Sequence, residues 1–210
     1  MKTLQRVIIF LLCAISLISC HVRQEVTLTL AGSGTSDLSV ELEPVFVFYI
    51  LDLAEAFSDS DNIEDIDIFE VDEIKKQING RPGASVKQIK TPDQERLTLT
   101  FRFSDIKKLL EPVDENIQDV ITFSSKKGVK KIQFHLEKAN YSQFTALFPF
   151  LNNPVFENLA PQVDEDIPAS EYLDIIEFAM GEEGPKAVLN SELQITVHVK
   201  GRIVSQKGGT

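Results

Sequence analysis

Residues 24–43 read QEVTLTLAGSGTSDLSVELE, and this stretch decides how the rest of the chain can fold. Apolar and polar residues alternate in both of its halves, and the apolar positions are Val26, Leu28, Leu30, Leu38, Val40 and Leu42. Alternation with a period of two is typical of a strand that buries one face. Gly32-Ser33-Gly34-Thr35 lies between the halves and supplies residues that can adopt a positive φ in a tight connection. The sequence therefore predicts a β-hairpin formed by residues 24–31 and 36–43.

An apolar run precedes this hairpin. Lys2 and Arg6 are followed by residues 7–19, VIIFLLCAISLIS, which are apolar or small throughout. Such a run is shorter than the roughly 20 residues that cross a bilayer, so it is typical of the apolar region of a signal peptide. Leu17-Ile18-Ser19-Cys20 at its end resembles the lipobox of bacterial lipoproteins. This resemblance implies that residues 1–19 are removed and that the thiol of Cys20 carries a diacylglycerol. The alternative is an ordinary secretory signal in which the cysteine is incidental.

Removal of residues 1–19 would leave a mature chain of residues 20–210, for which we expect a single domain anchored through Cys20. The formal charge would change from −11 to −13, because Lys2 and Arg6 leave and no acidic residue does. A chain with this charge repels nucleic-acid backbones, so nucleic acid is not an expected partner. The expected location is the bacterial cell envelope, outside the cytoplasm, with the acyl chains as the membrane attachment.

The chain has two cysteines, and neither is expected to be available for other thiol chemistry. Cys13 lies in the predicted signal peptide and Cys20 is the predicted lipid carrier. The mature domain would then have no thiol for a disulfide, a zinc site or a nucleophile. We expect it to fold on its hydrophobic core alone.

Residues 45–57 place apolar side chains at helical spacing after Pro44, which predicts a helix, although residues 45–51 alone could form a buried strand. A short helix should follow with Val71, Ile74 and Ile78 inward. A second hairpin is predicted from residues 85–90 and 96–103, because apolar and polar residues alternate along its second half. Ser104 is expected to cap a two-turn helix that carries Ile106, Leu109 and Leu110.

A third hairpin is predicted from residues 120–124 and 129–138, with Ile132, Phe134 and Leu136 inward. Helices are expected at 141–151 and 168–180, and a last strand at 192–200, with a short return strand after Gly201. The inward residues of the last strand should be Leu193, Ile195, Val197 and Val199. Strands and helices do not alternate regularly, so the fold class expected is α+β, an antiparallel sheet of hairpins with inserted helices.

Both ends of the predicted mature chain resemble the LppM-like envelope lipoproteins. The first end is the lipobox followed by VTLTL, GSGT and LSVEL, and the second is SELQITV at 191–197 followed by GRIV at 201–204. Residues 97–106 resemble the family more loosely. The resemblance implies an α+β envelope domain, for which binding of apolar or lipid molecules has been proposed in relatives. The chain departs from the family at Lys200-Gly201, where members often carry Pro-Gly, and in lacking the C-terminal membrane helix that many members add.

No arrangement of residues predicts catalysis, a cofactor or a metal site. His135 and His198 fall on the polar faces of their expected strands, and His21 lies beside the predicted anchor, which does not indicate zinc ligation. Asp59, Asp61 and Glu70 match three positions of a calcium loop, but Ile63 and Glu64 break its pattern. Ser33 lacks the surroundings of a nucleophile elbow. We therefore expect no enzyme activity, no cofactor and no metal ion.

Residues 141–156 form an unusual aromatic stretch without charge. One interpretation is a helix and loop of the hydrophobic core. The other is a flap over an apolar pocket, which is suggested because a proline at 149 interrupts helix pairing. In the second case the ligand-binding side chains would be Phe144, Leu147, Phe148, Phe150 and Leu151. The expected function is that of a non-catalytic, lipid-anchored envelope protein that binds an apolar or lipid ligand. The rival is a surface interaction protein that binds another envelope or host protein through its acidic face.

Overall fold

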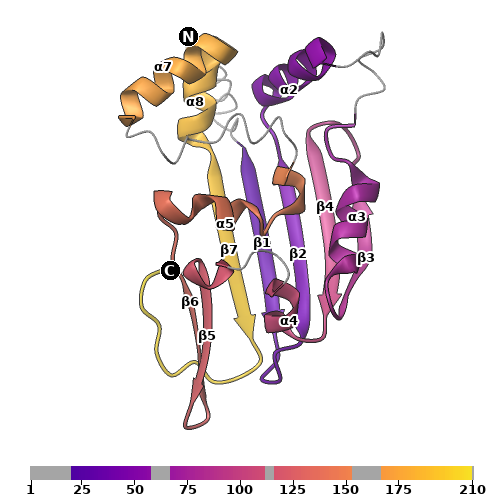
Figure 1. The fold of residues 1–210 in the computed structure, drawn as a ribbon, viewed down its shortest axis with the longest axis vertical. Helices are drawn as coiled ribbons and strands as arrows, with labels where there is room; N and C mark the ends of the chain where they lie inside the picture. Colours follow the sequence, from indigo (N-terminus) through magenta and orange to yellow (C-terminus); the bar gives the residue numbers. More distant parts are fainter. Residues whose placement is uncertain (1–19, 58–66, 112–115, 153–166, 210) are drawn as a thin grey trace, which may run out of the picture.

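The computed structural model describes residues 20–57, 67–111, 116–152 and 167–209. They form a five-stranded sheet in the order β3-β4-β2-β1-β7, a two-stranded sheet of β5 and β6, and several helices (Figure 1). The expected α+β class with antiparallel hairpins is therefore confirmed. The predicted signal peptide, residues 58–66 of the acidic tract and residues 153–156 of the aromatic stretch lie outside the described residues.

The predicted first hairpin is formed by β1 (His21–Leu28) and β2 (Gly34–Glu41). The N–H of Thr29 donates to the carbonyl of Ser33 at 2.8 Å, and Gly32 has a φ of +94°, a conformation that glycine adopts without strain. Gly34 pairs with Leu28, and a Cβ at this position would lie 1.9 Å from the carbonyl oxygen of Thr27. The connection therefore requires a residue without a side chain at the start of β2.

The second hairpin, β3 (Ala84–Lys90) and β4 (Arg96–Phe103), extends the sheet because β4 pairs antiparallel with β2. Alternate residues of β2 and β4 are buried, as the period-two pattern predicts: Ser36, Leu38, Val40, Leu97, Leu99, Phe101 and Phe103. This inner face of the sheet forms one side of the hydrophobic core.

The last strand, β7 (Glu192–Val199), lies at the edge of the sheet and pairs parallel with β1. Leu193, Val197 and Val199 are in register with Val22, Val26 and Leu28 and so belong to the inner face. The prediction of their direction is confirmed. They are covered only in part, however, because each remains at least 37% exposed at the edge of the core.

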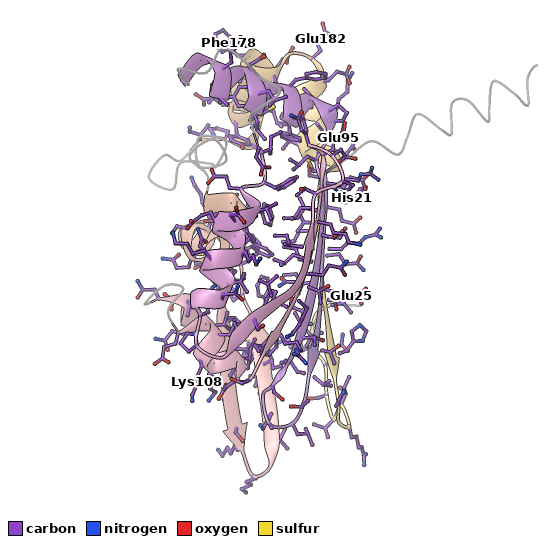
Figure 2. The ribbon with its side chains drawn as sticks, turned by 90° about the vertical axis from the view of Figure 1, so that its right-hand side faces the viewer. His21, Glu25, Glu95, Lys108, Phe178 and Glu182 are labelled. Atoms are coloured by element: carbon purple, nitrogen blue, oxygen red, sulfur yellow. The ribbon has the colours of Figure 1, made fainter. Side chains whose placement is uncertain are left out.

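A second layer covers the inner face. It contains α3 (Val71–Gly80), α4 (Ile106–Leu110), the hairpin of β5 (Ile121–Lys126) and β6 (Val129–Phe134), and α5 (Tyr141–Thr145). Short 3-10 turns at Ile117–Asp119, Lys138–Asn140 and Pro149–Asn152 connect these elements. Figure 2 shows this layer on one side of the sheet only, with His21 and Glu25 on the opposite side.

Three helices gather at one end of the sheet (Figure 1): α2 (Pro44–Phe57), α7 (Ala169–Met180) and α8 (Glu183–Asn190). The helix predicted at 45–57 is confirmed, and Pro44 begins it, because its fixed φ and missing N–H are compatible with the first turn. The helix predicted at 168–180 is confirmed as α7, and α8 was not predicted.

Other local predictions were wrong. Asp105, not Ser104, caps α4, since its carboxylate accepts from the N–H of Lys107 at 2.9 Å. β6 ends at Phe134, and Phe134 and Leu136 are more than 40% exposed. The single helix expected at 141–151 is instead α5 followed by a 3-10 turn, and residues 201–209 form no strand.

Candidate functional site

Cys20 lies where three distant parts of the chain meet. It directly precedes β1, and its carbonyl accepts from the N–H of Glu192 at 2.8 Å. Its Sγ accepts from the N–H of Glu43, just before α2, at 3.3 Å, and it also interacts with the side chain of Ser191, just after α8. The predicted lipidation residue is therefore held at the junction of the sheet with the helical end, without a linker between it and β1.

The thiol of Cys20 is partly buried against the core. Burial raises the pKa of this thiol from 9.0 to about 11, and the nearby carboxylate of Glu43 adds to the shift. The thiolate is the nucleophilic form of cysteine, so a thiol with this pKa is poorly reactive at neutral pH. Cys20 therefore lacks the lowered pKa and the access to solvent that are typical of a catalytic cysteine.

Carboxylates surround this junction. Glu43 is only 7% exposed, and its pKa is raised, mainly by burial and also by Glu183, whereas His21 opposes the shift. Nδ1 of His21 lies 3.7 Å from a carboxylate oxygen of Glu192. Sequence reasoning did not associate these groups with Cys20, because parallel pairing of β7 with β1 and the fold of α2 and α8 bring them together.

The five predicted ligand-binding residues do come together, but inside the molecule. Phe144, Phe148 and Phe150 are 6%, 2% and 5% exposed, and Leu147 and Leu151 pack against the core. The ring of Phe148 lies 5.1 Å from that of Phe144 and 5.9 Å from that of Phe150, in tilted and edge-on geometries that aromatic pairs favour. These contacts favour the core interpretation of the aromatic stretch.

Two polar side chains hold the segment around these rings. Asn140 is buried; its amide donates to the carbonyls of Asp119 and His135, each at 3.0 Å, and its Oδ1 accepts from the N–H of Glu137 at 2.8 Å. The guanidinium of Arg81 donates to the carbonyl of Ala146 at 3.5 Å, and burial lowers its pKa. Both side chains bond main-chain carbonyls and so have a structural role at these positions.

Apolar surface is instead exposed at β7. Leu193, Val197 and Val199 continue the inner face of the sheet and are 41%, 42% and 37% exposed. We call them the β7 strip. The edge position of β7 explains this exposure, because β1 pairs with only one side of the strand. The sequence pattern marked these residues as inward but could not show that their cover is incomplete.

The remaining predictions about chemistry concern isolated groups. His135 lies 3.3 Å from Glu137 and His198 lies 3.7 Å from Glu25, and all four side chains are well exposed. Within the described residues, no group of three or more His, Cys, Asp or Glu could hold a metal ion. None of the helices in the described ranges is long and apolar enough to cross a membrane.

Comparison of the chain with protein-family models, curated proteins and solved structures gave no match.

Proposed function

We propose that this protein is a lipid-anchored lipoprotein of the bacterial cell envelope, without catalytic activity, that binds an apolar or lipid ligand. The observation that carries the proposal is the position of Cys20. It ends an apolar run of signal-peptide type and directly precedes the first strand of the sheet. A resemblance to the LppM-like envelope lipoproteins at both ends of the chain supports the same function.

The partial burial of Cys20 adds a condition to its lipidation. In the folded domain, Sγ faces the N–H of Glu43 and the side chain of Ser191, and its pKa of about 11 keeps it protonated. Transfer of a diacylglyceryl group needs a thiol that is accessible and can lose its proton. Acylation would therefore precede the docking of residue 20 at the start of β1.

Metabolic labelling tests the anchor. Cells that express the protein should incorporate radioactive palmitate into it, and the Cys20→Ala variant should stay unlabelled and leave the detergent phase. Cys13→Ala is the matched control, because it removes the other cysteine and should label normally. Labelling of the Cys20→Ala variant would contradict the proposal.

The apolar ligand is assigned to the β7 strip rather than to the aromatic cluster, because the strip is exposed and the cluster is filled. A lipid chain that covers Leu193, Val197 and Val199 would remove apolar surface from water, at roughly 25 cal/mol for each Å². Native mass spectrometry of protein purified from its own cells should detect a co-purifying lipid. Val197→Glu should abolish binding of this lipid, whereas His198→Glu, on the opposite face of the same strand, should still bind it.

A second candidate function follows from the position of β7 at the edge of the five-stranded sheet that the described residues form. An exposed strand edge can pair with an extended segment of another protein, so this edge favours an interaction protein. The acidic surface expected for that role includes Glu171, Asp174, Glu177 and Glu183, which are exposed on α7 and α8. Cross-linking from β7 to a protein partner, in the absence of bound lipid, would favour this function over lipid binding.

A further inference from the structure

The helical end, formed by α2, α7 and α8, exposes large apolar side chains. Phe178 is 95% exposed, Leu189 69%, Phe48 67% and Ile175 49%. Phe178 and Ile175 are three positions apart on α7 and so occupy neighbouring places on one face of that helix. The opposite face of α7 packs inward through Ile176, which is 3% exposed. The exposed pair therefore does not contribute to the core.

Cys20 is at the same end of the molecule. Its Sγ contacts Glu43, the residue before Pro44 of α2, and its pKa is influenced by Ser191, the residue after Asn190 of α8. A group attached to this sulfur would emerge beside the helical end. Figure 2 shows Phe178 at the outer limit of that end, beyond the start of the sheet at His21.

The connection between the anchor and the fold is too short to hold the domain away from a membrane. β1 starts at His21, the residue after Cys20, and the carbonyl of Cys20 is already bonded to Glu192 of β7. Acyl chains on Cys20 would therefore keep the junction at the bilayer surface. The opposite end of β1, near Leu28, would lie about 25 Å away, because a strand advances about 3.3 Å per residue.

We infer that the helical end rests on the bilayer, with Phe178 and Ile175 of α7 in the interfacial region. This inference rests on the acylation of Cys20 proposed above and adds the orientation of the domain. Amphipathic helices bury their apolar face about 5–10 Å deep at the boundary of headgroups and acyl chains. The occupant of the surface around Phe178 and Ile175, where Glu171 and Asp174 lie on the same side of α7, is thus the membrane that holds the anchor.

Charge specifies the kind of lipid surface. Glu171, Asp174 and Glu177 are exposed on α7, and the helix has no basic residue. Anionic headgroups would repel these carboxylates, whereas zwitterionic headgroups carry no net charge. The inference therefore commits to a zwitterionic surface, and anionic lipid should weaken the contact of α7.

The absence of tryptophan from the chain allows a direct test. Phe178→Trp places a single tryptophan at the helical end, and its emission can be excited separately from that of the tyrosines. The matched control, Leu30→Trp, places one at the opposite end of β1, where Leu30 is 64% exposed. Each variant is purified in its acylated form, its acyl groups are verified by intact mass, and it is reconstituted into phosphatidylcholine vesicles with or without brominated acyl chains.

Bromine should reduce the emission of the Phe178→Trp variant by roughly twofold or more, because burial of about 5–10 Å brings the ring to the acyl chains. The Leu30→Trp variant should be unaffected. Acylated protein with equal quenching in both variants, or with no quenching at Phe178→Trp, would overturn this inference and leave the proposed anchor intact. Stronger quenching in anionic vesicles than in phosphatidylcholine vesicles would also overturn it. So would shielding of the Phe178→Trp ring from solvent by a second molecule of the protein in detergent. Protein that lacks acyl groups would overturn the anchor and this inference together.

Discussion

Truncation of Phe148 to alanine separates the two interpretations of the aromatic cluster. Phe148 is 2% exposed and its ring contacts those of Phe144 and Phe150. Removal of a buried phenylalanine ring costs about 3–5 kcal/mol, because the lost contacts leave a cavity that the neighbours only partly fill. For a domain of this size each kcal/mol corresponds to about 2–4 °C, so the melting temperature should fall by roughly 6–20 °C.

The chain offers a control of the same residue type. Phe178 is 95% exposed, so Phe178→Ala should change the free energy of unfolding by less than about 0.5 kcal/mol. Both variants are compared with the parent protein in the same detergent, by urea unfolding followed with far-UV circular dichroism and by titration with a fluorescent fatty acid. The core interpretation would be refuted by a loss below about 1 kcal/mol in Phe148→Ala accompanied by loss of fatty-acid uptake.

Four further predictions concern single residues. In the unacylated precursor carrying Cys13→Ser, Cys20 should react with iodoacetamide at pH 8 about a hundredfold more slowly when folded than in urea, because its pKa is about 11 instead of 9.0. Because the thiolate of Cys20 is disfavoured in the folded state, its thiol should contribute fully to the free energy of unfolding below about pH 9. This contribution should fall as the pH rises towards 11, and measurements of unfolding at several pH values would show it. Gly34→Ala should destabilise by about 1–3 kcal/mol or more through its clash with Thr27, whereas Gly80→Ala, with no atom within 4 Å of the new Cβ, should be neutral or stabilise by up to about 1 kcal/mol. Asn140→Ala should cost about 1–3 kcal/mol in thermal unfolding because it leaves buried main-chain groups without their partner, and an unchanged melting temperature would contradict the role given to this amide.

The hairpins could be predicted from the sequence because they are local. The two strands of each hairpin are close in the chain, and period-two alternation identifies the face that each strand buries. Leu97, Leu99, Phe101 and Phe103 are all buried, as their spacing indicates. Gly32 marked the first turn for the reason that the structure shows, a positive φ, whereas Gly34 is required by the close approach of Thr27, which the sequence did not indicate.

Features that depend on distant segments could not be predicted in this way. The parallel pairing of β1 with β7 joins strands separated by most of the described chain, and no short-range pattern encodes it. The helix α8 contains Gly184 and Pro185 and follows Gly181, so its sequence suggests a loop. Its Gly184 is buried, and a Cβ there would lie 2.8 Å from the Cβ of Met180, so α8 packs closely against α7 at a contact that is not visible in its own sequence.

The same limitation applies to the candidate site. The sequence marked Cys20 through the motif that ends the apolar run, but Glu43, Ser191 and Glu192 become its neighbours only through the fold. The aromatic residues were correctly grouped, since they are close in the chain. Whether they line a cavity or fill the core depends on the elements that pack against them, and in the structure the rings of Phe144, Phe148 and Phe150 pack against each other.

The position of Cys20 connects folding with anchoring. The carbonyl of Cys20 is bonded to β7 and its sulfur to Glu43, just before α2, so the proposed anchor residue is fixed only after the first and last strands have paired. A diacylglyceryl group on this sulfur would have to emerge past Glu43 and Ser191, because these residues occupy its surroundings in the folded chain. Lipidation before folding would let the domain assemble around the anchor, with the helical end directed towards the membrane. Lipidation after folding would require residue 20 to detach from both Glu43 and Glu192, since each bonds it directly.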